Sequence, residues 1–332
     1  MRKPVTISDV AAHAGVSPTT VSHALSGRRS VSPATLARVQ QAADELGYRP
    51  SRVASSLRTQ RTHTLALIVP DIANPFYPTV ARGLHDAIAT DGYYTLIGST
   101  DGARETELGF LDEMVRRSVD GIVLFSFAIE EDDLTRVVPA RIPLAVATHN
   151  LTTLHDQVNS DDTAGTEAAT RHLLAQGITE IAFVSGPKGH GPGDRRLAGF
   201  TQAMQDAGLV PAEADVVRSD YTVAGGRHAV GELLGRRKRP RAVICANDLI
   251  AIGALEAARA VGAAVPADLA VIGFDDIDAA SLVAPALTTV VNPAYEMGRE
   301  CGRLLLDRLV GGYDGPPRAV VVPTHLVTRA TA

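Results

Sequence analysis

The chain has 332 residues and a formal net charge of −5, and 45% of its residues are hydrophobic against 21% charged. This length predicts roughly two to three domains, and the composition is ordinary for a globular protein rather than a disordered or fibrous one. The start, MRKPVTISD, lacks the apolar run of a signal peptide, and no stretch reaches the roughly 18 apolar residues of a membrane span. We therefore expect a cytoplasmic protein with no membrane partner.

The charge is unevenly distributed along the chain. Residues 1–61 contain nine basic and three acidic residues, a net charge of +6, so that the remainder carries −11. A small basic head on an acidic body is the asymmetry expected when only the head meets polyanionic phosphate.

A first short helix is predicted near the start of the chain. Ile7, Val10, Ala11 and Ala14 recur at the i, i+3, i+4, i+7 spacing that places apolar side chains on one helix face. Gly15 then ends this helix.

A second helix is predicted to begin at Ser17 or Pro18, because serine can cap a helix and proline suits its first position. Val21, Ala24 and Leu25 share its apolar face. Two short helices joined by a glycine-containing turn form the helix-turn-helix pattern, although an ordinary helical hairpin would show the same spacing. The outward face of the second helix holds Pro18, Thr19, Ser22 and His23.

A third helix is predicted from the cap Ser32 and Pro33 to Gly47, which completes a compact three-helix bundle. The stretch 49–62 is polar and basic, with a hint of a further helix of two turns. Because so short a helix is unstable alone in water, we interpret 49–62 as a linker that becomes ordered with a partner.

From Thr64 onward, strands and helices alternate in two successive series. Such alternation indicates parallel sheets covered on both faces, here in two similar α/β subdomains. The predicted strands are 65–69, 94–98, 121–125 and 143–147, followed by 181–185, 215–219, 242–246 and 269–274. The predicted helices are 80–90, 103–117, 132–138, 162–176, 194–207, 222–234 and 248–261.

Ligands of such folds bind outside the carboxyl ends of the strands, so residues at those ends are candidate pocket linings. The loop GPKGHGPGD (186–194) is glycine-rich but fits neither a dinucleotide fingerprint nor a phosphate loop of the Walker A type. We interpret it as a flexible loop at the edge of a cleft. Cys245 and Cys301 stand far apart without a CxxC neighbourhood, which indicates neither a zinc site nor a disulfide.

Seven motifs in order resemble the lactose-repressor (LacI/GalR) family of bacterial transcription regulators. They are VTISDVAAHAGVSPTTVSHALSG, RPSRVASSLR, IVPDIANPF, RRLAGF, CANDLIAIGAL, VIGFDDI and PALTTV. The resemblance runs almost from end to end. It implies a helix-turn-helix head, a hinge helix, and a periplasmic-binding-protein type I core of two Rossmann-like subdomains.

The resemblance also implies domain boundaries. We expect a DNA-binding domain at 1–48, a hinge at 49–62 and an effector-binding core at 63–332. The chain should cross between the core subdomains three times, with strands near 288–291 and 318–322 completing the first subdomain and its boundary. We place subdomain 1 at about 63–160 plus 292–321, and subdomain 2 at about 161–291 plus 322–332.

For the head, the family correspondence places Pro18, Thr19 and His23 at base-reading positions, in agreement with the outward face. Thr19 offers a hydroxyl and a methyl group, and His23 can donate to guanine. Pro18 offers only apolar contact, and a solvated surface residue is the plain alternative for His23. Leu57 matches the leucine that the family inserts into the minor groove, or it packs between hinge helices. Phosphate contacts are expected from Ser8, Thr20, Ser22 and Arg29.

For the core, the family pattern singles out Arg196, Asn247 and Asp275, a set of donors and acceptors that suits a ligand with several hydroxyls. Other expected effector contacts are Asp71, Asn74, Phe76, Tyr77, Phe125 and Tyr221. Asp248 is interpreted as a helix N-cap and Asp276 as structural, and Tyr77 could equally belong to the core. Many members carry an acidic residue after the fourth strand where this chain has Thr148 and His149, also counted as candidate contacts.

The sequence therefore predicts a repressor whose small-molecule effector, a sugar or sugar-like metabolite, binds between the core subdomains and controls DNA binding. We expect no cofactor, no metal and no enzymatic activity, and a homodimer on a pseudo-palindromic operator. The chain ends at Ala332 without leucine heptads, which favours a dimer over a larger assembly. The alternatives are a solute-binding transport protein and an α/β enzyme. The basic head argues against the first, and the lack of a phosphate loop or nucleophile elbow against the second.

Overall fold

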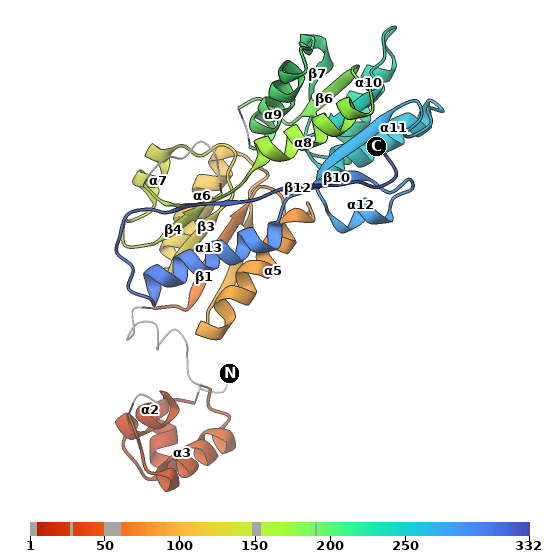
Figure 1. Ribbon diagram of the computed structural model, residues 1–332. Coiled ribbons are helices and arrows are strands. Elements are labelled where there is room, and N and C mark those ends of the chain that lie inside the picture. The colour runs from red at the N-terminus through yellow and green to blue at the C-terminus, as the bar shows by residue number, and fades with distance from the viewer. Residues whose placement is uncertain (1–4, 27–28, 50–60, 148–153, 190) are drawn as a thin grey trace. The chain divides into compact units, whose positions relative to one another are not determined.

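The computed structural model describes residues 5–26, 29–49, 61–147, 154–189 and 191–332 (Figure 1). The chain divides into two compact units, Met1–Thr62 and His63–Ala332. Three predicted contacts, Leu57, Thr148 and His149, lie outside the described residues, as does most of the predicted hinge.

The first unit contains the three predicted helices, α1 (Ile7–Ala14), α2 (Pro18–Ser26) and α3 (Pro33–Leu46). Side chains and turns fix their ends: the Ser17 hydroxyl accepts a hydrogen bond from the Thr20 N–H at 3.1 Å, and Gly15 ends α1 with a φ of +63°. The apolar faces meet in one small core around Val10, Val21 and Val39. The helix predictions made from capping and spacing are thus confirmed.

The second unit contains two six-stranded sheets. The first has the strand order β11-β5-β4-β3-β1-β2, and its strands are all parallel. They are β1 (Thr64–Val69), β2 (Tyr94–Ser99), β3 (Gly121–Leu124), β4 (Leu144–Val146), β5 (Asp156–Ser160) and β11 (Ala319–Val322).

The second sheet has the order β12-β10-β9-β8-β6-β7, with only its edge strand β12 antiparallel. Its strands are β6 (Ile181–Ser185), β7 (Val216–Arg218), β8 (Ala242–Cys245), β9 (Ala270–Asp275), β10 (Thr288–Val291) and β12 (His325–Val327). The strand at 288–291 therefore belongs to the second sheet, in agreement with the range 161–291 expected for subdomain 2, and it does not complete the first subdomain.

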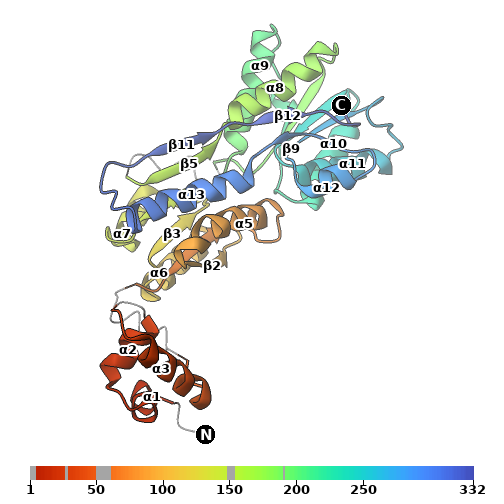
Figure 2. The same cartoon turned by 60° about the horizontal axis from the view of Figure 1, so that its bottom comes forward.

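Helices cover both faces of each sheet (Figures 1 and 2). The first sheet packs against α5 (Phe76–Ile88) and α13 (Ala294–Leu309) on one face and against α6 (Arg104–Arg116) and α7 (Glu131–Val137) on the other. The second sheet carries α8 (Asp162–Ala175), α9 (Gly193–Asp206), α10 (Val223–Leu234), α11 (Asp248–Ala260) and the short α12 (Asp278–Leu282). None of the helices in the described ranges combines the length and hydropathy that crossing a lipid bilayer requires.

Among the strands and α-helices, four were not predicted from the sequence: β5, β12, the short helix α12 and the long helix α13. The last of these belongs to the first sheet although it follows the second in the chain (Figure 2). It lies against α5 through close backbone contact, since a Cβ at Gly298 would stand 2.1 Å from the Val80 carbonyl oxygen. Glycine is therefore required at that crossing.

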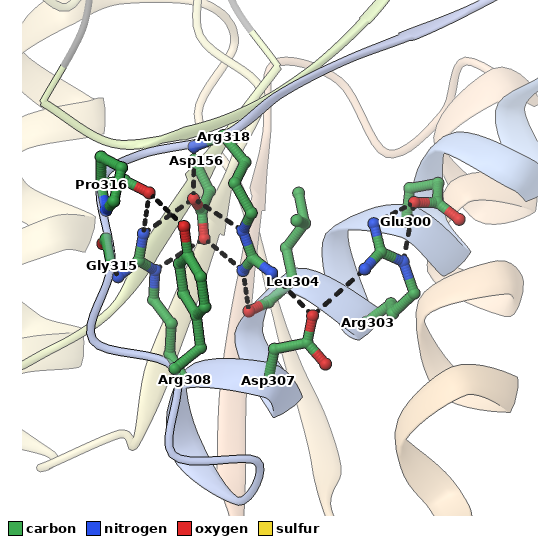
Figure 3. A network of polar contacts seen from close by, with 10 residues as sticks. Asp156, Glu300, Arg303, Leu304, Asp307, Arg308, Gly315, Pro316 and Arg318 are labelled. Atoms are coloured by element: carbon green, nitrogen blue, oxygen red, sulfur yellow. Dashed lines mark hydrogen bonds and ion pairs between the residues drawn. The ribbon is translucent and has the colours of Figure 1, made fainter.

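A buried ion-pair network holds the end of α13 to the strands beside it (Figure 3). The Asp156 carboxylate on β5 accepts hydrogen bonds from Arg308 Nε at 2.7 Å and from Arg318 Nη2 at 3.0 Å. Both guanidinium groups also lie over the ring of Tyr313. Burial raises the pKa of Asp156, but these hydrogen bonds outweigh it and bring the pKa down to about 2.

The chain passes between the two sheets at three crossovers: from β5 to α8, from β10 to α13, and from β11 to β12. The first and third lie together, because the Thr324 hydroxyl donates to the Asp161 carbonyl at 2.8 Å. These crossovers place the carboxyl ends of both sets of parallel strands around one cavity.

Candidate functional site

A pocket lies at the carboxyl ends of strands from both sheets, with a volume of about 710 Å³ including its opening to solvent. Its position is the one predicted for open parallel sheets. The first sheet contributes Pro70, Asp71, Asn74, Phe76, Tyr77, Phe125, Ser126, Phe127, Ala147, Asn159 and Ser160. The second contributes Gly191, Pro192, Arg196, Tyr221, Asn247 and Asp275, and the crossover helix region adds Asn292 and Met297.

Arg196 on α9 supplies the only positive charge among the described lining residues. It is 3% exposed, and its guanidinium lies 3.6 Å from the centre of the Phe274 ring. Nε donates to Asp162 at 2.8 Å, and Nη1 donates to the Ala246 carbonyl. These contacts fix the plane of the guanidinium, so its remaining N–H groups are held in one orientation.

Asp275 stands opposite this guanidinium at the end of β9, with its Oδ1 3.6 Å from Arg196 Nη1. The same oxygen accepts a hydrogen bond from Asn292 Nδ2 at 3.0 Å. Burial raises the pKa of Asp275 to about 6, although Arg196 and the Asn292 hydrogen bond act to lower it. Its φ of +117° is unusual for a residue with a side chain, which is typical of a functional site.

Of the two candidate asparagines, Asn247 is the N-cap of α11, whereas Asn74 precedes Pro75, the N-cap residue of α5. Asn247 Oδ1 accepts from the Ile250 N–H at 2.8 Å at the start of α11, and Asn74 Oδ1 accepts from the Phe76 N–H at 3.1 Å at the start of α5. The interpretation of Asp248 as the cap is therefore wrong by one residue. Asp248 is instead fully buried, and its carboxylate accepts from the Ile277 N–H and the Thr289 hydroxyl.

Aromatic rings form much of the pocket wall. Phe76, Tyr77 and Phe125 meet edge to face in the core of the first subdomain, so Tyr77 belongs to both the core and the lining. Phe127 from the first subdomain approaches Tyr221 from the second, with ring centres 5.6 Å apart. The Tyr221 hydroxyl accepts a hydrogen bond from the Gly193 N–H at 3.0 Å.

The pocket contains all the predicted effector contacts that fall on described residues. Sequence reasoning missed Phe127, Asn159 and Asn292, which lie in loops or on strands without a periodic pattern. Their place after β3, in β5 and after β10 was nevertheless a usable signal, since strand ends line such pockets. Asp276, predicted as structural, accepts a hydrogen bond from Arg329 at 2.6 Å. In the described part of the chain, no group of three His, Cys, Asp or Glu residues is arranged to hold a metal ion.

On the head, the second helix presents its polar face outward, as predicted. Pro18 and Thr19 are exposed, and Ser22 and His23 are partly exposed. Ser8 and Arg29 are exposed as well. The hydroxyl of Thr20 lies 2.9 Å from that of Ser17, so Thr20 serves the helix cap as well as the surface.

Two known protein families match parts of this chain. The family described as "Bacterial regulatory proteins, lacI family" matches residues 6–51, and the "Periplasmic binding protein-like domain" matches residues 170–332. The solved structure titled "transcriptional regulator CelR-cellobiose complex" is 33% identical, covers 99% of this chain and 100% of that one, and has a TM-score of 0.75.

The Lac repressor dimer bound to operator and the anti-inducer ONPF is 26% identical over 99% of each chain, with a TM-score of 0.88. The HTH-type transcriptional repressor CytR of Escherichia coli (strain K12) is 36% identical over 317 residues, which are 93% of this chain and 91% of that protein. Similarity at this level over almost the full length of both chains shows that this protein belongs to the lacI family of bacterial regulatory proteins.

Proposed function

We propose that the protein is a DNA-binding transcriptional repressor, and not an enzyme, controlled by a sugar or sugar-like effector bound between the core subdomains. The observation that carries the proposal is the pocket itself. It draws residues from the ends of both sheets, so a ligand that contacts both subdomains favours one arrangement of them over another. The relatives support both halves of the proposal, since CytR is a repressor and CelR was solved with cellobiose.

The head is the proposed DNA-contacting part, with Thr19 and His23 reading base edges and Pro18 in apolar contact. Their exposed or partly exposed places on one face of α2 support this assignment. Ser8, Thr20, Ser22 and Arg29, all exposed or partly exposed, are proposed to contact phosphates, which position the helix without reading sequence. Leu57 is proposed to enter the minor groove.

The operator-binding form is proposed to be a homodimer. The edge strand β2 leaves three large apolar side chains exposed: Tyr94 at 52%, Leu96 at 41% and Ile97 at 48%. Unpaired strand edges with apolar side chains are surfaces that a partner chain covers. A second copy would also supply a second head for an inverted half-site.

Removal of residues 1–61 tests whether operator binding requires the head. The remaining core is expected to lose operator binding, measured by fluorescence anisotropy, because it keeps no base-reading helix and an overall negative charge. Undiminished DNA affinity of the truncated chain would refute the assignment. Circular dichroism and thermal unfolding serve as the folding control, since the core forms a compact unit of its own.

A further inference from the structure

We infer that the pocket takes an uncharged, hydroxyl-rich ring compound and rejects its phosphorylated counterpart. The inference rests on the proposed function and deepens it by naming the chemical class of the effector. It follows from three features of the pocket: the balance of charge, the side-chain hydrogen bonds already made by N–H groups at nearby helix N-termini, and the surplus of hydrogen-bond acceptors.

The charge balance disfavours an anion. The described lining residues include two carboxylates, Asp71 and Asp275, and one guanidinium, that of Arg196. Asp162, directly behind the pocket, already forms an ion pair with Arg196, with Nε and Oδ1 2.8 Å apart. A phosphate that approached Arg196 would come within a few ångströms of Asp275, and because both side chains are buried, the two negative charges would repel strongly.

At three helix N-termini beside the pocket, one N–H group already donates to a side chain of the protein. Free N–H groups at such ends form the usual anion sites of α/β folds. Here the Phe76 N–H of α5 donates to Asn74, the Gly193 N–H of α9 to the Tyr221 hydroxyl, and the Ile250 N–H of α11 to Asn247. In the loop before α5, the Ala73 N–H donates to Asp71 Oδ1 at 2.8 Å. A phosphate would therefore have to compete with the protein's own side chains for these four N–H groups.

The pocket instead offers acceptors to hydroxyl groups. Asn292 is 5% exposed, and because its Nδ2 donates to Asp275, its Oδ1 must act as an acceptor. That buried oxygen has no hydrogen-bond partner among the described residues. A hydroxyl can donate to such acceptors and also accept from the remaining N–H groups of Arg196, whereas an ionised phosphate can only accept.

The aromatic wall adds a preference for a ring. Phe127 and Tyr221 bring flat apolar surface from both subdomains to one side of the pocket. The C–H face of a sugar ring, or the plane of a base, can pack there while hydroxyls point to Asp275 and Asn292.

The experiment compares matched pairs by calorimetry and thermal shift on the full chain: D-ribose, D-glucose and uridine, each against its monophosphate, together with inorganic phosphate. We expect the phosphorylated member of each pair to bind at least about tenfold more weakly than its neutral partner. Inorganic phosphate should leave Tm unchanged. Equal or tighter binding of a phosphorylated member, or a saturable rise in Tm with phosphate, would overturn the inference.

Two variants test the physical causes. Asp275→Asn removes the opposing carboxylate, and Tyr221→Phe keeps the ring but releases the Gly193 N–H at the start of α9. Each is expected to shift the ratio of affinities toward the phosphorylated member. The exposed Asp314→Asn is the matched control for net charge and should leave the ratio unaltered. An unchanged ratio in both pocket variants counts against the inference. Operator binding is measured separately, so a failure of the repressor assignment is distinguishable from a failure of ligand selectivity.

Discussion

Asp275 lines the pocket, and its carboxylate also lowers the folding stability of the protein. Its pKa of about 6 lies above the ordinary value of 3.8 that the unfolded chain would show. The native state therefore binds more protons than the unfolded state between those pH values, and stability falls as pH rises through this window.

Asp275→Asn is accordingly expected to stabilise the ligand-free protein at pH 7 by about 3 kcal/mol, the value of roughly two pKa units. The gain should shrink toward zero at pH 4, because the carboxyl is then protonated in both states. Urea unfolding across pH 4 to 7 measures the difference. A gain that does not depend on pH would show that the carboxylate charge is not its cause.

His23→Ala addresses base reading on the head. If the imidazole contacts a base edge, the variant should lose about 1–3 kcal/mol at the operator and little on non-specific DNA. Arg29→Ala is the matched comparison, expected to weaken both kinds of DNA alike and to reduce the salt dependence. Anisotropy titrations at several salt concentrations distinguish the two. A uniform loss with His23→Ala would place His23 among the phosphate contacts.

At the scale of elements, α13 shows what periodicity alone does not reveal. Its buried residues Met297, Cys301, Leu304 and Leu305 follow helical spacing, yet this helix returns from the second sheet to pack on the first. Its helical form follows from the local sequence, but the chain topology determines which sheet it packs against.

The Asp156 network anchors that returning helix. Asp156→Asn is expected to destabilise the core by about 3 kcal/mol, because it leaves two partly buried guanidinium groups without their carboxylate. Glu300→Gln on the same helix is the control: it removes a more exposed pair with Arg303 and should cost less than about 1 kcal/mol. Denaturant unfolding at pH 7 compares them. Equal losses would mean that burial of the network contributes nothing.

The same network makes the folding stability depend on pH in the acid range. Since the pKa of Asp156 in the folded protein is about 2, its contribution is complete above the ordinary value of 3.8 and is lost as pH falls toward 2. The wild-type protein should therefore lose stability in that range faster than Asp156→Asn does.

The strands show where sequence patterns succeed and fail. β1, β3 and β8 are buried along almost their whole length and were predicted from continuous apolar runs. β5 reads DQVNS and β12 has only three residues, so neither carries an apolar run. Similarly, Phe127 and Asn292 lie in connecting segments, which show no helical or strand periodicity in the sequence. Asn247 and Asp248 are both good caps by residue type, and only the fold distinguishes their roles.

At the scale of the whole molecule, motif order identified the family, and the strand-end rule located the pocket before its lining was known. The sequence could not show which groups form hydrogen bonds with one another. The hydrogen bonds from Gly193 to Tyr221 and from Asn292 to Asp275 join segments remote in the chain. The selectivity inferred above depends on those pairings.

The exposed apolar side chains of β2 lead to a prediction about assembly. Leu96→Asp is expected to convert the dimer to a monomer and to weaken operator binding by the loss of the second head, because a buried charge in an apolar contact is costly. Val210→Asp, at a position 85% exposed, is the control and should leave the dimer intact. Light scattering at micromolar concentration reads the mass. A tetrameric wild type, or a Leu96→Asp protein that stays dimeric, would contradict the proposal.

The third crossover has a consequence for synthesis on the ribosome. One edge strand of each sheet, β11 in the first and β12 in the second, comes from the single segment 319–327, whereas the other strands lie between residues 64 and 291. Neither sheet can be completed until that segment has been translated, whereas the helical head can fold long before. A frameshift ahead of Ala319 would therefore leave β5 and β10 uncovered in the same nascent chain and expose both halves of the core to aggregation at once.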